Sequence, residues 1–150
     1  NRKDKRGYIL DVFVNDPKDH CTVVSFNKNA IGTDINSSDN QIVYGGGYDH
    51  NFILNKQHPD SLTRAATVFE PNRGVKMEIF TTEPGIQFYG GNFMDGSDIG
   101  KYGKRFLYRE SFALETQHYP DSPNNQSFPN VYLLPTETYK SSTIYKFTID

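Results

Sequence analysis

Residues 64–81, RAATVFEPNRGVKMEIFT, carry the clearest structural pattern in the sequence. Every second residue of 75–81 is apolar or β-branched, which predicts a long strand whose one face holds Val75, Met77, Ile79 and Thr81. Residues 64–70 alternate in the same way, with Ala66 and Val68 on one face and Ala65, Thr67 and Phe69 on the other. The linking segment PNRG, residues 71–74, is typical of a hairpin connection. The stretch therefore predicts two antiparallel strands joined by a tight turn.

The composition extends this interpretation to the whole chain. Phe (11) and Tyr (10) supply most of the bulk among 150 residues, whereas only four residues are Ala, so long helices are not expected. Twelve glycines and eight prolines provide frequent turns. A chain of this length is the size of one domain, although 35% hydrophobic residues make a lean core. The sequence predicts an all-β, antiparallel fold.

Further strands are predicted on both sides of the hairpin. Their shared signal is a short run of β-branched or aromatic residues bounded by turn residues, in residues 8–14, 22–26, 41–44, 52–54, 86–89, 106–108, 112–115, 131–134 and 138–149. Residues 27–40 are polar and loop-like, and residues 90–105 form a long Gly-rich loop of the kind that lines functional sites.

Charge and cysteine content exclude several classes of function. The net charge of −2 implies neither a nucleic acid nor an anionic membrane as a partner. No apolar run reaches the length of a membrane span. The single cysteine, Cys21, fits a reducing compartment, and we expect a cytoplasmic protein.

Residues 113–124, ALETQHYPDSPN, place one carboxylate where a strand gives way to a loop. Glu115 stands at the end of a short apolar run, and Pro120 and Pro123 break the segment that follows. A carboxylate at a strand end suits proton transfer, because both its position and its partial desolvation can be controlled there. Glu115 is therefore a candidate acid or base.

Three separated motifs in the same order resemble the aldose 1-epimerases, also called galactose mutarotases: residues 46–52 (GGYDHNF), 82–89 (TEPGIQFY) and 113–124. The resemblance runs from about residue 26 to residue 150 and is loose over residues 1–22. It implies the large two-sheet super-sandwich of that family, of which residues 1–150 would form the C-terminal part of a single domain.

The resemblance also implies site residues and an activity. Glu115, in the segment LETQ, matches the family's catalytic base, whereas Asp49 and Gln87 match residues that hydrogen-bond sugar hydroxyls. The implied reaction interconverts the α- and β-anomers of a free hexose such as galactose or glucose. One base and one acid suffice for it, so no metal or cofactor is expected.

The general acid is not found in this chain. In the family it is a histidine in an Asn-His-Ser/Thr motif that precedes the matched region, and His20, His50, His58 and His118 do not stand in that motif. We therefore expect the chain to be inactive without an N-terminal half, and its protein partner would be the N-terminal half of the same protein or another chain. The alternative function is a non-catalytic carbohydrate-binding or regulatory module that retains the same fold.

Two other groups of residues remain open at this point. His50 and His118 could form a metal site with Asp49, Glu115 and Asp121, but the short His–His or Cys–Cys spacing of such sites is missing. Four aromatic residues could stack on the apolar face of a sugar, although aromatic residues in strands more often belong to the core; they are Phe88, Tyr89, Phe93 and Tyr119.

Overall fold

The computed structural model describes residues 9–12 and 29–149. Strands dominate this part of the chain: β1 (Ile9–Val12), β2 (Asn29–Ala30), β3 (Asp49–Ile53), β4 (Thr63–Glu70), β5 (Val75–Thr81), β6 (Gly85–Tyr89), β7 (Ala113–Gln117) and β8 (Thr143–Ile149). The described helices are short, namely α1 (Asn40–Gly45) and the 3₁₀ turns η1 (Lys101–Gly103) and η2 (Ser122–Asn124). None of them has the length and apolar character needed to span a membrane.

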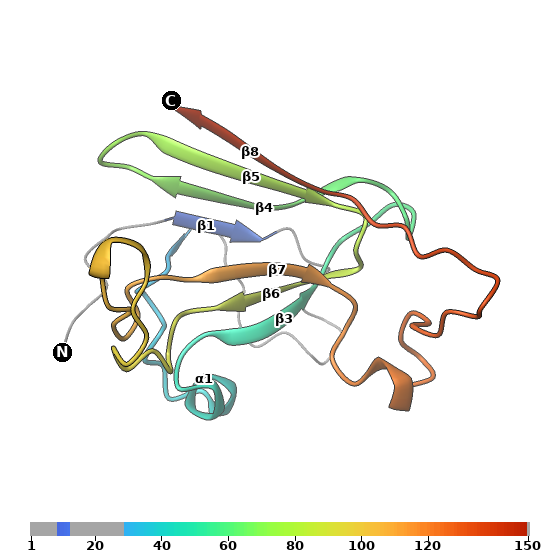
Figure 1. The fold of residues 1–150 in the computed structure, drawn as a ribbon, viewed down its shortest axis with the longest axis horizontal. Coiled ribbons are helices and arrows are strands. Elements are labelled where there is room, and N and C mark those ends of the chain that lie inside the picture. Colours follow the sequence, from blue (N-terminus) through green and yellow to red (C-terminus); the bar gives the residue numbers. More distant parts are fainter. Residues whose placement is uncertain (1–8, 13–28, 150) are drawn as a thin grey trace.

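The strands form two antiparallel sheets that lie one above the other (Figure 1). One sheet has five strands in the order β2-β1-β4-β5-β8, and the other has three in the order β3-β6-β7. Every described strand pairing is antiparallel. The predicted all-β, antiparallel fold is confirmed.

The predicted hairpin is the pair β4–β5. Gly74 closes its turn with φ of 71°, a backbone conformation that glycine adopts without strain. The Glu70 carboxylate accepts hydrogen bonds from the backbone N–H groups of Asn72 and Arg73, both at 2.9 Å. The predicted alternation fails at one place, because a register shift between Arg64 and Ala66 lets two consecutive alanines, Ala65 and Ala66, both become fully buried.

The hydrophobic core lies between the two sheets and is extended by the segment around α1. The five-stranded sheet contributes Ala65, Ala66, Val68 and Ile79, the three-stranded sheet contributes Phe52, Ile86 and Phe88, and the flanking segments contribute Ile31, Ile35, Ile42, Tyr48 and Leu54. The core residues of the three-stranded sheet, Phe52, Ile86 and Phe88, all have even residue numbers. Because side chains alternate along a strand, the odd-numbered residues of β3 and β6 face away from the core. The outward face of that sheet is therefore free to carry polar groups.

The prediction of a strand over residues 41–44 is wrong, because this segment forms α1. Asp39 caps the helix by accepting a 2.8 Å hydrogen bond from the Gln41 N–H, and Gly46 ends it in the left-handed conformation with φ of 64°. The short run Ile42, Val43 and Tyr44 fits either structure, and the capping residues on both sides favour the helix. The helix buries Ile42 and leads directly into β3.

The predicted strands over residues 106–108 and 131–134 are also wrong. Phe106 donates its N–H to the Asp98 carbonyl at 3.1 Å within a loop that folds back on itself. Leu134 donates to the Glu137 carboxylate at 2.9 Å in an open turn, and the apolar side chains of residues 131–134 are exposed. Neither segment finds a neighbouring strand among the described residues. The predicted strand over residues 22–26 lies outside the described part of the chain.

The last strand, β8, begins at Thr143 rather than at the predicted residue 138. Its register with β5 places Tyr145 opposite Ile79 and Phe147 opposite Met77, on the side of the sheet that faces the core. Tyr145 is nevertheless 49% exposed and Phe147 66% exposed. At this edge of the described structure, an inward-facing apolar surface is left uncovered.

Candidate functional site

The structure brings the three predicted site residues together on the outward face of the three-stranded sheet. Gln87 in β6 lies directly opposite Glu115 in β7, and the Gln87 Nε2 atom donates a 2.8 Å hydrogen bond to the Asp49 Oδ1 atom at the start of β3. All three stand at odd positions, whereas the core residues of the same strands stand at even positions. Gln87 and Glu115 follow Asp49 by 38 and 66 positions in the sequence, and the fold brings the three residues into one polar strip.

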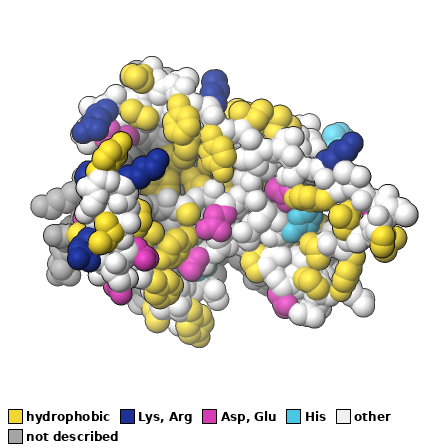
Figure 2. Space-filling model, in the orientation of Figure 1, with side chains coloured by type: hydrophobic (Ala, Val, Ile, Leu, Met, Phe, Trp, Pro, Cys, Tyr) yellow, Lys and Arg dark blue, Asp and Glu magenta, His cyan; other side chains and the backbone are white. Residues whose placement is uncertain are grey.

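The strip is open to solvent. Glu115 is exposed, and Asp49 and Gln87 are half-buried. Figure 2 shows acidic side chains over β7 and β3, in a hollow between two lobes of the surface. The expected position of Glu115 at a strand end is wrong, because β7 continues to Gln117. The expected partial desolvation is also not present, because β7 is an edge strand of its sheet in the described chain and no described segment covers it there. The carboxylate is accessible to a ligand from outside the sheet.

Aromatic rings flank the strip at both ends. Tyr89, opposite Asp49, stacks on Phe93 with ring centroids 6.3 Å apart, and its hydroxyl accepts a 3.0 Å hydrogen bond from the Phe93 N–H. Phe93 is 68% exposed. At the other end, the Tyr119 ring lies beside Gly85 and meets Phe128 edge-on at 5.3 Å. Phe88 points the opposite way and is fully buried, so it belongs to the core.

Glycine is required where the strip meets Tyr119. A Cβ added to Gly85 would lie 2.9 Å from Asn51 Oδ1 and 3.1 Å from the Tyr119 ring. Both distances are shorter than ordinary carbon contacts, so any side chain here would displace the aromatic wall or the neighbouring carboxamide. Because Gly85 has no side chain, the Asn51 carboxamide and the Tyr119 ring can close the end of the strip.

The described histidines take no direct part in the strip. His50 uses both ring nitrogens on the backbone: Nδ1 accepts from the Asp49 N–H at 3.0 Å, and Nε2 lies 3.2 Å from the Gln41 carbonyl oxygen. His118 turns its Nδ1 atom to Glu83, at 2.8 Å. No group of three potential metal ligands occurs among the residues that the structure describes, so the metal arrangement considered from the sequence is not formed there.

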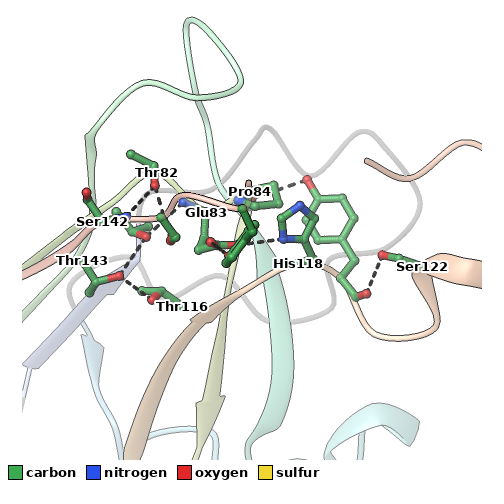
Figure 3. A network of polar contacts seen from close by, with 12 residues as sticks. Thr82, Glu83, Pro84, Thr116, His118, Ser122, Ser142 and Thr143 are labelled. Atoms are coloured by element: carbon green, nitrogen blue, oxygen red, sulfur yellow. Dashed lines mark hydrogen bonds and ion pairs between the residues drawn. The ribbon is translucent and has the colours of Figure 1, made fainter. Parts of the chain in front are cut away.

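Glu83 is the centre of a polar network that joins the ends of several strands (Figure 3). The residue is only 4% exposed, its carboxylate accepts a hydrogen bond from the Tyr139 hydroxyl, and its Oε2 atom lies 2.8 Å from the His118 Nδ1 atom. Nearby, Thr143 of β8 bonds Thr116 of β7 at 2.7 Å, which links the two sheets. The network fixes the end of β7, the strand that carries Glu115.

A groove of about 770 Å³ lies beside this network. Its walls are His118, Tyr139 and parts of the segment from residue 130 to residue 140. Asp49, Gln87 and Glu115 are not among its lining residues, so the groove and the polar strip are separate features.

Glu83 gives the fold a predicted dependence on pH. Burial alone would raise the pKa of Glu83, but hydrogen bonds from Ser141 and Tyr139 and the nearby His118 outweigh it and hold that pKa below its ordinary value of 4.5. A carboxylate with a lowered pKa stabilises the folded state above pH 4.5, and this contribution is lost as the pH falls through the lowered value.

We therefore expect Glu83→Gln to lower the free energy of unfolding by about 1–3 kcal/mol at pH 7, because it removes a buried charge that Ser141, Tyr139 and His118 stabilise. The difference from the parent should shrink as the pH falls below 4.5. Thermal unfolding of both proteins between pH 7 and pH 3 measures this. A difference that stays constant over the range would show that the Glu83 charge contributes nothing. The positive charge of Lys56 also acts on Glu83, and Lys56 is present in both the parent and the variant.

Asn51 is a site residue that the sequence analysis missed. It lies in β3 directly opposite Gln87, which itself lies opposite Glu115, so the three residues form a row across the sheet. The available signal was its position two residues after Asp49, since alternate residues of a strand share a face. The register that aligns it with Gln87 could not be read from the sequence.

These features define the class of protein: an antiparallel β-sandwich with an aromatic-flanked strip of carboxylates and carboxamides on one outward sheet face. Residues 14–146 match the family model described as aldose 1-epimerase, and the chain belongs to that family. The resemblance noted from the three motifs is confirmed.

Individual relatives agree with this assignment. The chain is 41% identical to galactose mutarotase from Rattus norvegicus and 42% identical to galactose mutarotase from Homo sapiens, in each case over 69% of this chain and 30% of the relative. It is 36% identical to aldose 1-epimerase from Escherichia coli strain K12, over 67% of this chain and 29% of the relative. The chain thus matches less than a third of the length of these relatives.

A solved structure supports the fold. The GalM/aldose epimerase homologue from C. elegans superposes with a TM-score of 0.66, over 96% of this chain and 46% of that protein. The sequence identity is 21%, so this similarity concerns the fold alone. It confirms the predicted mutarotase-like sandwich architecture.

Proposed function

We propose that the protein carrying this chain is an aldose 1-epimerase that interconverts the anomers of a free hexose, galactose or glucose, and that this chain supplies the base. The observation that carries the proposal is the polar strip, in which Gln87 lies directly opposite Glu115 and donates a hydrogen bond to Asp49. A carboxylate accepts strongly from vicinal hydroxyls, and a carboxamide both donates and accepts, so the strip suits a polyhydroxylated ligand.

Glu115 acts as the base in this mechanism. It removes the proton of the C1 hydroxyl while an acid protonates the ring oxygen, and the bond between C1 and the ring oxygen breaks. Rotation about the C1–C2 bond then turns the other face of the aldehyde towards the C5 hydroxyl, and the ring closes with both proton transfers reversed. No cofactor enters any step. Asp49 and Gln87 hold other sugar hydroxyls, and Tyr89, Phe93 and Tyr119 flank the ring.

The general acid comes, in this proposal, from a part of the domain outside this chain. His50 and His118 are engaged with backbone groups and Glu83. The relatives are more than three times as long as the region matched. The uncovered inward face of β8, with Tyr145 and Phe147, would pack against the same missing part. A cytoplasmic location remains a prediction from the single cysteine.

We expect residues 1–150 alone to be inactive for this reason, and polarimetry with freshly dissolved α-galactose and α-glucose tests this. The full-length protein should accelerate the change in optical rotation, whereas the isolated chain should not, and its mass in solution should be measured in parallel. A folded monomer of residues 1–150 with robust, Glu115-dependent activity would contradict the proposed origin of the acid.

The alternative function is a non-catalytic carbohydrate-binding or regulatory module. The exposure of Glu115 favours this alternative, because a general base gains from a drier site than the described residues provide. The two functions differ in one outcome: a binding module would bind the sugar without changing the rate of anomer interconversion.

A further inference from the structure

Two buried polar atoms in the row have no hydrogen-bond partner among the residues that the structure describes. They are the Nδ2 donor of Asn51 and the Oε1 acceptor of Gln87. The two residues are directly opposite each other, so their Cβ atoms are ~4.5–5.5 Å apart and their carboxamides are within reach of one another. A donor and an acceptor that could satisfy each other thus stand side by side and unpaired.

The reason for this mismatch is the orientation of the two carboxamides. Gln87 directs its Nε2 atom to Asp49, at 2.8 Å, and this leaves its Oε1 atom without a donor. Asn51 lies over Gly85, with its Oδ1 atom closest to that residue. An unpaired buried polar group is unfavourable, and native structures tolerate few of them, so a pair of them in a candidate site requires an explanation.

We propose that Asn51 is a positioning residue of the sugar site, which holds Gln87 through a hydrogen bond from its Nδ2 atom to the Gln87 Oε1 atom when the ligand is bound. This inference rests on the proposed function. When sugar hydroxyls donate to the Asp49 carboxylate, the Asp49–Gln87 hydrogen bond is released. The Gln87 carboxamide then turns its Oε1 atom to Asn51 and presents its Nε2 donor to the sugar.

The arrangement couples sugar binding to the satisfaction of two buried groups. In the free protein, the Asp49 carboxylate is occupied by Gln87, and Asn51 has no acceptor for Nδ2 among the described residues. In the bound protein, Asp49, Gln87 and Asn51 all have partners. The unsatisfied pair therefore favours the bound state, and a ligand unable to donate to Asp49 would not gain from it.

The first test compares stability. Asn51→Ala removes a donor that is unpaired in the free protein, so the melting temperature should be unchanged or higher. Asn92→Ala is the control, because that carboxamide is buried as well but is paired: it donates to the carbonyls of Gly45 and Tyr48, at 3.0 and 2.8 Å. Asn92→Ala should melt at a lower temperature. A purely structural role for Asn51 would make both variants melt lower.

The second test measures function in the full-length protein. Asn51→Ala should raise the KM for galactose by about 5–10-fold, the range expected from one lost hydrogen bond, with a smaller effect on kcat. In a Gln87→Ala background the same change should have no further effect on KM, because Asn51 acts through Gln87. Asn51→Asp, which can only accept from Gln87 and adds charge beside Asp49, should raise KM more than Asn51→Ala does.

The outcomes separate the two proposals. If the parent accelerates mutarotation and Glu115→Gln does not, while Asn51→Ala keeps the parent KM, the role of Asn51 is overturned and the proposed function stands. Independent effects of Asn51→Ala and Gln87→Ala on KM would also overturn it. If the full-length parent neither binds galactose nor changes its mutarotation, the proposed function itself fails.

Discussion

Replacing Glu115 by alanine in the full-length protein is expected to slow galactose mutarotation by about 10²–10⁴-fold, the usual contribution of a positioned general base. Sugar affinity should change little, because Asp49 and Gln87 remain in place on β3 and β6. Polarimetry gives the rate, and equilibrium binding of galactose gives the affinity. The separation of the two effects distinguishes a base from a residue that only binds substrate.

A control for this experiment exists on the opposite sheet. Glu78 is also a strand carboxylate, but it stands on β5 of the five-stranded sheet. There it pairs with Arg64 of β4 and Lys146 of β8, at 3.2 and 3.3 Å. Glu78→Gln therefore makes a comparable change of charge away from the strip and should keep the parent rate. If Glu115→Ala were within a factor of two of the parent, Glu115 would not be the base.

The second large effect is expected at Asp49. Asp49→Asn removes a charged acceptor, and charge-assisted hydrogen bonds are the stronger ones, so we expect galactose affinity to fall by about 10–100-fold. The rate at saturating sugar should fall as well, because the substrate is held less firmly against Glu115. Titration of galactose followed by kinetics at saturation measures the two effects separately.

The side-chain arrangement makes this prediction specific. Asp49 and Gln87 are hydrogen-bonded neighbours in the free protein, but Asp49 offers the sugar a charged acceptor, whereas Gln87 offers a neutral carboxamide. We therefore expect the loss of affinity to be larger for Asp49→Asn than for Gln87→Ala. Equal losses would contradict the stronger contribution of the Asp49 charge, and unchanged affinity in both variants would place the sugar elsewhere on the molecule.

The sequence predicted the central hairpin well because β4 and β5 are half-buried strands. Alternation of side chains between core and solvent is a direct consequence of strand geometry, and it survives in residues 75–81. It was broken at Ala65 and Ala66 by a bulge, which depends on the partner strand and is invisible in one sequence. Residues 41–44 were misassigned because a short apolar run fits both structures, and the capping residues on either side decided for a helix.

The site was predicted less completely than the fold. Glu115, Asp49 and Gln87 were identified from motifs, and Gln87 alone would have been one polar residue on a strand. What the sequence could not supply was register: the alignment of Asn51, Gln87 and Glu115 depends on pairing across three strands. Asn51 was missed for this reason. The exposure of Glu115 was missed because burial depends on which segments cover an edge strand.

The most direct test of the account is the rate of anomer exchange in galactose at equilibrium, measured by NMR magnetisation transfer between the two anomeric protons. With the full-length parent protein, the exchange rate should rise in proportion to protein concentration, and with Glu115→Gln it should stay at the spontaneous rate while the sugar still binds. If the parent binds galactose and leaves the spontaneous exchange rate unchanged, the protein is a carbohydrate-binding module and Glu115 is not a catalytic base.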